Sequence, residues 1–139
     1  MSILKPGLEE RYKRVKQSLA DDEMRFGREP GSVFLLPVSK TFGINALEEA
    51  VKCGMRAFGE NYVQEGCEKI EYFKKQHPDL EITWHFIGHL QSNKTRPVAE
   101  HFDWVQTVDR LKIAQRLSEQ RPADMPPLNV LIEVHISDE

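Results

Sequence analysis

Short apolar runs rich in Val, Ile, Phe and Trp alternate along this chain with segments whose apolar residues recur at helical spacing. The starts of successive runs lie roughly 20 to 30 residues apart, which leaves room for one helix between each pair of strands. This alternation predicts parallel strands joined by helical crossovers, with helices covering the sheet. The five runs that we expect to be strands are residues 33–38, 55–58, 83–87, 104–108 and 129–136.

Apolar positions on one helical face define the expected helices. One helix precedes the first strand, ends at the turn 27–31, and should pack its apolar stripe on the sheet. We expect Gly54 to end the following helix, and Asn61 and Asp109 to cap the next two. The four sets of apolar residues are Leu8, Tyr12, Val15 and Leu19; Ile44, Leu47 and Val51; Val63, Cys67, Ile70 and Phe73; and Leu111, Ala114 and Leu117.

The length of the chain limits how this α/β pattern can close. A complete (β/α)8 barrel takes about 250 residues, whereas this chain has 139. After the last expected strand only Ser137, Asp138 and Glu139 remain, so no helix follows it. We therefore expect a single incomplete domain over residues 1–139, either a small open sheet or a fragment of a barrel.

Composition excludes several classes of protein. The net charge is -3, from 19 basic and 22 acidic residues spread along the chain, so no basic stripe indicates nucleic acid as a partner. No apolar stretch approaches the roughly 20 residues of a membrane span, and the N-terminus lacks the apolar segment of a signal peptide. We expect a cytoplasmic protein with no membrane partner, in which Cys53 and Cys67 are reduced thiols.

Chemistry in parallel α/β folds gathers at the carboxyl ends of the strands. Lys40 directly follows the first expected strand, and an amine at the mouth of a sheet can form a Schiff base with an aldehyde. From position alone, a solvated surface lysine is the more common interpretation. Other residues at this edge are Ser39, Thr41, residues 59–61, residues 88–91 and Asp109.

The remaining polar residues have simpler interpretations. His85 and His89 resemble a metal pair, but four residues of extended strand would separate them by about 13 Å, so they cannot share one ion unless the strand ends between them. We predict no metal site. Glu60 and Glu65 are expected to be solvated carboxylates at a helix start. Residues 91–96 could meet an anion at a helix N-terminus, although they lack the glycine spacing of a phosphate-binding loop.

Three motifs taken together are far more specific than any of these positions. They are residues 37–41 (Pro-Val-Ser-Lys-Thr), 58–65 (Phe-Gly-Glu-Asn-Tyr-Val-Gln-Glu) and 84–94, which begin Trp-His-Phe-Ile-Gly-His. With residues 101–104 and 127–132, they make the chain resemble the pyridoxal phosphate homeostasis protein family from about residue 8 to its end. The resemblance implies a partial (β/α)8 barrel, similar to the N-terminal domain of alanine racemase, with about five parallel strands and an extra N-terminal helix.

The resemblance also implies a cofactor and its ligands. Lys40 would hold pyridoxal 5'-phosphate as an internal aldimine, and Asn61 and His85 would line the cofactor pocket, with no catalytic residue assigned. Family chains continue through further βα units that hold the cofactor phosphate. We therefore expect the N-terminal part of a longer protein, or a truncated form.

Three functions remain open from the sequence. The first is a binding protein of intracellular pyridoxal phosphate homeostasis that stores the cofactor or hands it to pyridoxal phosphate-dependent apoenzymes. The second is a racemase or decarboxylase using the same cofactor, which would need a second acid or base opposite Lys40. The third is an interaction module that exposes unpaired strand edges.

Overall fold

The computed structural model describes residues 7–137. The chain forms two compact units, one made of Met1–Pro37 with Gly43–Met55 and the other of Val38–Phe42 with Arg56–Glu139. No helix within the described range is long and apolar enough to cross a membrane. The Lys40 segment thus belongs to the same unit as the sheet.

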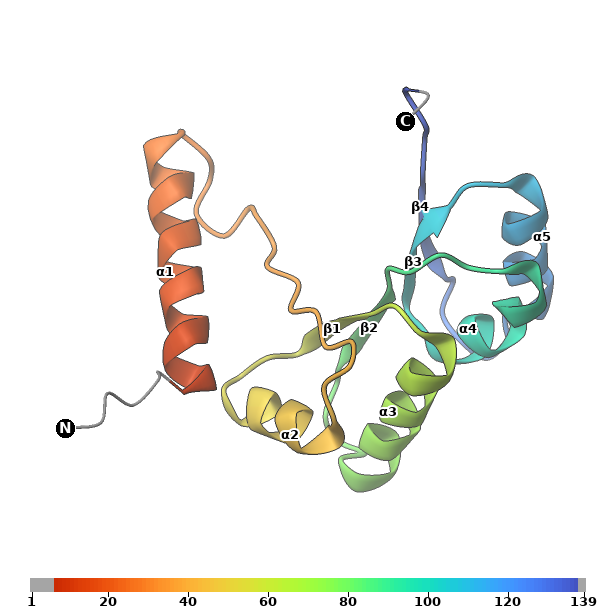
Figure 1. Ribbon diagram of the computed structural model, residues 1–139, viewed down its shortest axis with the longest axis horizontal. Helices are drawn as coiled ribbons and strands as arrows, with labels where there is room; N and C mark the ends of the chain where they lie inside the picture. The colour runs from red at the N-terminus through yellow and green to blue at the C-terminus, as the bar shows by residue number, and fades with distance from the viewer. Residues whose placement is uncertain (1–6, 138–139) are drawn as a thin grey trace. The chain divides into compact units, whose positions relative to one another are not determined.

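The smaller unit contains the helices α1 (Leu8–Arg25) and α2 (Ile44–Lys52) (Figure 1). Its N-terminal helix confirms the prediction made from apolar spacing. At its end the Glu23 carboxylate accepts the backbone N–H groups of Gly31 at 3.2 Å and Val33 at 2.9 Å, which holds the following loop against the helix. After α2 the chain turns at Gly54, whose φ of 97° is the left-handed conformation expected of a helix-ending glycine.

The larger unit contains a four-stranded parallel sheet in the order β1-β2-β3-β4 (Figure 1). This confirms the predicted α/β class with parallel strands in sequence order. The strands are β1 (Ala57–Glu60), β2 (Thr83–Phe86), β3 (Trp104–Val108) and β4 (Asn129–Ile132). The helices are α3 (Val63–Gln76), α4 (Thr95–His101), which a 3-10 turn at Ser92–Lys94 precedes, and α5 (Leu111–Gln120).

Side chains alternate between the two faces of this sheet. On β2, Trp84 contacts Phe73 of α3 with ring centroids 6.0 Å apart, so Trp84 lies on the face that the helices cover. The core on this side consists of buried apolar residues, including Ile70, Phe86, Val98, Phe102, Val105, Ile113 and Leu117. The strand register sets Val38, Gly59, His85 and Trp104 in one row on the opposite face.

The predicted first strand, residues 33–38, is wrong except at its end. Only Val38 pairs, through an isolated parallel bridge to Gly59. Pro37 has no N–H group to donate to a sheet ladder, which accounts for the loss of pairing before this point. The described sheet therefore has four strands and one bridge, not five full strands.

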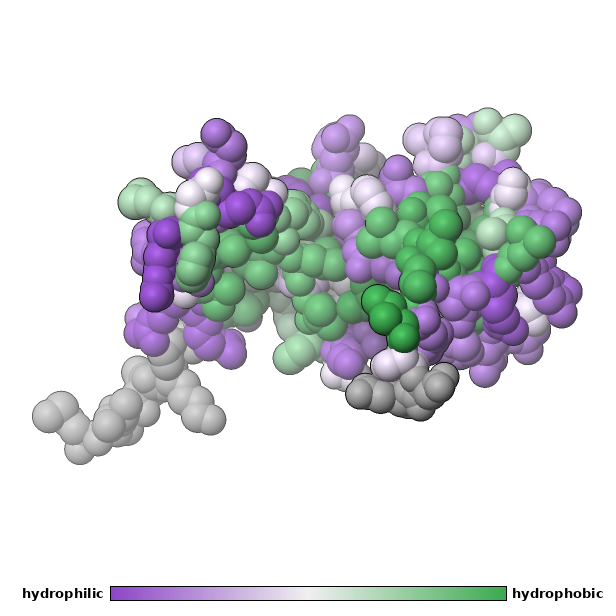
Figure 2. Space-filling model, turned by 90° about the horizontal axis from the view of Figure 1, so that it is seen from above, coloured by the Kyte–Doolittle hydropathy of each residue, from purple (hydrophilic) through white to green (hydrophobic). Residues whose placement is uncertain are grey.

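The last strand is shorter than predicted, since β4 ends at Ile132 and not at residue 136. Every residue of β4 is exposed, although all of them except Asn129 are apolar. Figure 2 shows apolar side chains at the surface of this end of the sheet. The exposed apolar residues here are Val130, Leu131, Ile132, Val134 and Ile136.

Both predicted helix caps are wrong. Tyr62 occupies the N-cap position of α3 and Arg110 that of α5, and neither helix has a side-chain cap. Asn61 and Asp109 each lie one residue too early, because a capping side chain reaches the second or third N–H group of the helix from the N-cap position itself. Asn61 therefore lacks the structural role that its position in the sequence suggested.

Candidate functional site

Lys40 lies just beyond the Val38 bridge, at the carboxyl edge of the sheet. Its side chain is exposed, and among residues 7–137 no acidic group forms an ion pair with it. The structure thus places the predicted lysine where a solute can reach it.

The backbone on both sides of Lys40 is fixed by hydrogen bonds. Before it, Ser39 is 5% exposed and donates its N–H to the carbonyl of Gly59 at 2.9 Å. The Ser39 carbonyl accepts Nζ of Lys69 at 2.8 Å. After it, the N–H of Thr41 donates to Oε1 of Glu65 at 2.8 Å. These contacts anchor the segment to β1 and to α3.

Lys69 is 4% exposed, and its ammonium lies between two carboxylates. Nζ is 2.6 Å from Oε1 of Glu60 and 2.8 Å from Oε1 of Glu65. Glu60 is 0% exposed, so the expectation of a solvated carboxylate there is wrong. Burial raises the pKa of Glu60, while the hydrogen bond and the charge of Lys69 act in the opposite direction.

Val38 and Gly59 pair across the sheet. Lys40 lies two residues after Val38, and Asn61 lies two residues after Gly59. The structure therefore sets Asn61 and Lys40 at neighbouring positions of one edge. Oδ1 of Asn61 is buried and accepts no hydrogen bond from the described residues. A buried acceptor without a donor is uncommon in proteins and needs an explanation.

His85 is 7% exposed. It lies in the same row across the sheet as Val38, the residue two positions before Lys40. Its ring stacks on Trp104, with centroids 5.4 Å apart and planes 11° from parallel. Nδ1 lies 3.1 Å from Nε2 of Gln106. Burial lowers the pKa of His85, and the charge of Asp103 opposes that shift more weakly.

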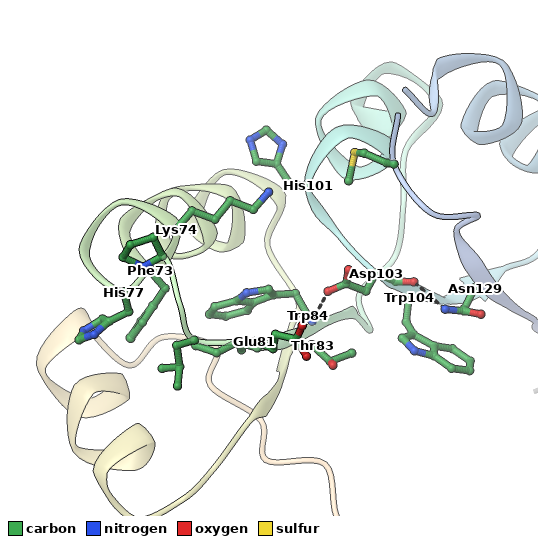
Figure 3. A pocket seen from close by; sticks show the side chains of 14 residues that line it. Phe73, Lys74, His77, Glu81, Thr83, Trp84, His101, Asp103, Trp104 and Asn129 are labelled. Carbon is green, nitrogen blue, oxygen red and sulfur yellow. Dashed lines mark hydrogen bonds between the residues drawn. The ribbon is translucent and has the colours of Figure 1, made fainter. Parts of the chain in front are cut away.

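Two hollows of this unit lie away from Lys40. One of about 450 Å³ lies between α3 and the residues that follow β2; it is lined by Asn61, Cys67 and His89 but not by Lys40 or His85. The other, of about 520 Å³, lies at the amino ends of β2, β3 and β4 (Figure 3). There Oδ2 of Asp103 accepts the N–H of Trp84 at 2.8 Å. This second hollow is at the opposite edge of the sheet from Lys40.

The sequence missed the buried network around Lys69. The spacing of Glu65 and Lys69 permits an i,i+4 ion pair, and the position of Glu60 at the end of an apolar run indicates burial. Nothing in the sequence, however, joins Lys69 to the Ser39 carbonyl.

Over residues 7–137 the structure has no group of three or more His, Cys, Asp or Glu side chains placed to hold a metal ion.

Comparison with known proteins gives clear relatives. The chain is 56% identical over 132 residues to the pyridoxal phosphate homeostasis protein of Vibrio cholerae, a match that covers 95% of this chain and 56% of the relative. It is 64% identical over 112 residues to the protein of the same name from Haemophilus influenzae, covering 81% of this chain and 46% of the relative. No protein-family model matches the chain.

Solved structures agree with these sequence matches. PipY of Synechococcus elongatus PCC7942, solved with PLP bound, superposes with a TM-score of 0.61 at 40% identity, over 76% of this chain and 47% of PipY. A protein of Bifidobacterium adolescentis superposes with a TM-score of 0.72 at 31% identity, over 86% of this chain and 53% of that one. The family resemblance inferred from the motifs is confirmed, and the chain spans about half the length of the curated relatives it matches.

Proposed function

We propose that this chain, a homologue of the pyridoxal phosphate homeostasis proteins, binds pyridoxal 5'-phosphate through Lys40. One observation carries the proposal: the exposed Lys40 amine stands at the carboxyl edge of a parallel sheet, on a backbone anchored on both sides. A homologous structure, that of PipY, has PLP bound, which supports the same ligand here.

The residues at this edge fit the chemistry of such a ligand. Pyridoxal phosphate supplies an aldehyde carbon that a primary amine can attack. Lys40 would be the residue that holds the cofactor, through a bond between its amine nitrogen and that aldehyde carbon that forms with loss of water. The reaction consumes no oxidant or reductant and is reversible, as a storage or delivery protein requires.

Asn61 and His85 are the other two residues that we assign to the cofactor. The buried Oδ1 of Asn61 has no donor among the described residues, so a bound molecule with a donor group would satisfy it. His85 lies in the row beneath the edge, where its stack on Trp104 fixes the plane of the ring. Neither residue is assigned a proton-transfer step.

We assign the chain a binding role in the control of intracellular pyridoxal phosphate, not catalysis of an amino-acid reaction. Binding by a reversible bond to one lysine allows the cofactor to be released, and pyridoxal phosphate-dependent apoenzymes are the proposed recipients. The names of the curated relatives, which refer to homeostasis, support this role.

We also propose that the sheet is part of a (β/α)8 barrel of the alanine racemase type. The parallel order β1-β2-β3-β4 supports this architecture, with the Val38 bridge next to β1 and helices between successive strands. In such barrels the carboxyl ends of the strands carry the functional groups, which is where Lys40 and Asn61 stand.

The test is covalent labelling. The chain is mixed with pyridoxal phosphate, reduced with borohydride, digested and analysed by mass spectrometry for pyridoxyl-lysine. We expect the label on Lys40 and its loss in Lys40→Ala, while Lys112→Ala, which removes an exposed lysine of α5, keeps the label at Lys40. Labelling spread evenly over exposed lysines, with no excess at Lys40, would refute the assignment.

A further inference from the structure

We infer that Lys69 and Glu65, two residues of α3, are positioning residues that hold the Lys40 backbone in the geometry that binds the cofactor. The inference rests on the proposed function. It adds to that proposal a pair of side chains that do not touch the ligand and act through the chain on either side of Lys40.

The two contacts bracket Lys40. Nζ of Lys69 donates to the carbonyl of Ser39 at 2.8 Å, on the N-terminal side. Oε1 of Glu65 accepts the N–H of Thr41 at 2.8 Å, on the C-terminal side. Both partners in the segment are backbone groups, so these bonds restrain the main-chain torsions that aim the Lys40 side chain.

The Lys69 ammonium ties these contacts together, because it lies against two carboxylates as well as the Ser39 carbonyl. Nζ of Lys69 donates hydrogen bonds to the Ser39 carbonyl and to Glu65 Oε1, and it forms an ion pair with Glu60 Oε1 at 2.6 Å. Glu60 and Lys69 are both buried, so water does not screen their attraction. Hydrogen bonds with an ionised partner are shorter and stronger than neutral ones.

The backbone at Thr41 needs such restraint. Its φ is 66°, in the left-handed region, and Thr41 is the one residue other than glycine with a positive φ between residues 7 and 137. A β-branched residue enters that region only at a cost in free energy, and the conformation persists when surrounding contacts enforce it. The bond from the Thr41 N–H to Glu65 is such a contact.

Glu65 is the residue to change, because its side chain is 32% exposed, whereas Lys69 and Glu60 are buried in the core. Glu65→Ala removes the acceptor for the Thr41 N–H. Glu65→Gln keeps an oxygen at that place without the charge. Glu68→Ala is the matched control, since Glu68 is an exposed residue of the same helix and accepts a hydrogen bond from Nε2 of Gln64 at 3.2 Å.

Three measurements separate positioning from general stability. The rate of amide hydrogen exchange at Thr41 measures how firmly the backbone N–H is held. The amount of pyridoxyl-lysine trapped at Lys40 with a limiting concentration of cofactor measures binding. Reductive methylation of Lys40 by formaldehyde measures whether the amine is accessible to a small reagent. In Glu65→Ala we expect Thr41 exchange to rise and cofactor label to fall, each by about tenfold, with methylation unchanged. Glu65→Gln should recover part of both effects, and Glu68→Ala should behave as the unsubstituted chain does.

The outcomes are distinct. Unchanged exchange and label in Glu65→Ala would overturn the inference while leaving the Lys40 assignment standing. An equal fall in label and methylation would overturn it too, because the loss would then be one of access to the amine. Failure of the unsubstituted chain to label at Lys40 would overturn the proposed function and, with it, this inference.

Discussion

The imidazole of His85 stacks on the indole of Trp104, with the two planes 11° apart. Both side chains belong to the row on the sheet face opposite α3, α4 and α5, and His85 is 7% exposed. Burial disfavours the charged imidazolium and lowers the pKa of His85, while the charge of Asp103 acts in the opposite direction more weakly.

This relationship predicts a pH dependence of stability. Because the pKa of His85 is lower in the folded than in the unfolded chain, its contribution to stability is fully present above about pH 6.5 and is lost as pH falls through the folded-state value. In His85→Asn that contribution is absent, so the free energy of unfolding should decrease less between pH 7.5 and pH 5 than in the unsubstituted chain. Urea unfolding at both pH values measures the difference. Equal decreases in the two proteins would contradict the expected protonation behaviour.

The buried pair of Glu60 and Lys69 predicts a second pH effect. Lys69→Met leaves the Glu60 carboxylate buried without its cation, which should cost about 3 to 5 kcal/mol of stability at pH 7. The pKa of Glu60 is already raised by burial, and loss of Lys69 raises it further, so the penalty should shrink toward pH 4 as Glu60 binds a proton.

Lys75→Met is the control for this change, since Lys75 is an exposed residue of the same helix. Its effect should stay within about 0.5 kcal/mol at both pH values. A penalty for Lys69→Met that is the same at pH 4 and pH 7 would show that lost packing, not the stranded carboxylate, dominates.

Gly88 predicts a steric effect on the site. A Cβ atom added there would meet the backbone oxygen of Asn61, which cannot move without shifting the end of β1. Gly88→Ala should lower the free energy of unfolding by about 1 to 3 kcal/mol and weaken cofactor labelling at Lys40. Gly43→Ala, where a Cβ atom meets nothing within 4 Å, should cost less than about 1 kcal/mol. Thermal melting of the two variants compares them, and equal losses would argue against the close approach.

The thiol of Cys67 should react slowly with alkylating reagents. Burial raises its pKa to about 11 from the usual 9.0, and neighbouring glutamates add to the shift. At pH 8 the thiolate fraction should be roughly a hundredfold below that of an unperturbed thiol. Iodoacetamide labelling followed by mass spectrometry should show a rate at Cys67 that keeps rising through pH 9.5. A plateau below that pH would contradict the predicted shift.

The sequence predicted the elements whose signal is local. β2 and β3 are short apolar runs bounded by polar residues, and β3 begins and ends at the predicted residues. The helix α1 also follows from apolar spacing alone. The prediction of a strand at residues 33–38 was wrong because Pro37 interrupts the backbone hydrogen bonds of the sheet, although the composition of this run otherwise favours a strand.

The residues of the candidate site could also be predicted only in part, because the sequence carries local signals and not contacts between distant segments. Lys40 could be named because a family motif surrounds it, and Asn61 because it stands in another motif. The pairing of Lys69 with Glu60 and with the Ser39 carbonyl depends on how α3 lies against β1, which no local pattern encodes. A buried carboxylate such as Glu60 therefore looked like an ordinary solvated one.

The bonds from α3 to the Lys40 segment end on backbone atoms, and this has an evolutionary consequence. Every amino acid at position 39 supplies a carbonyl, and every amino acid except proline at position 41 supplies an N–H, so most mutations at those positions leave the bonds available. Selection for the geometry of Lys40 would fall instead on Glu65 and Lys69, which stand 24 and 30 residues away from the groups they hold. In diverging descendants of this chain, these two bonds therefore place little demand on the side chains at positions 39 and 41, whereas they require the side chains of Glu65 and Lys69.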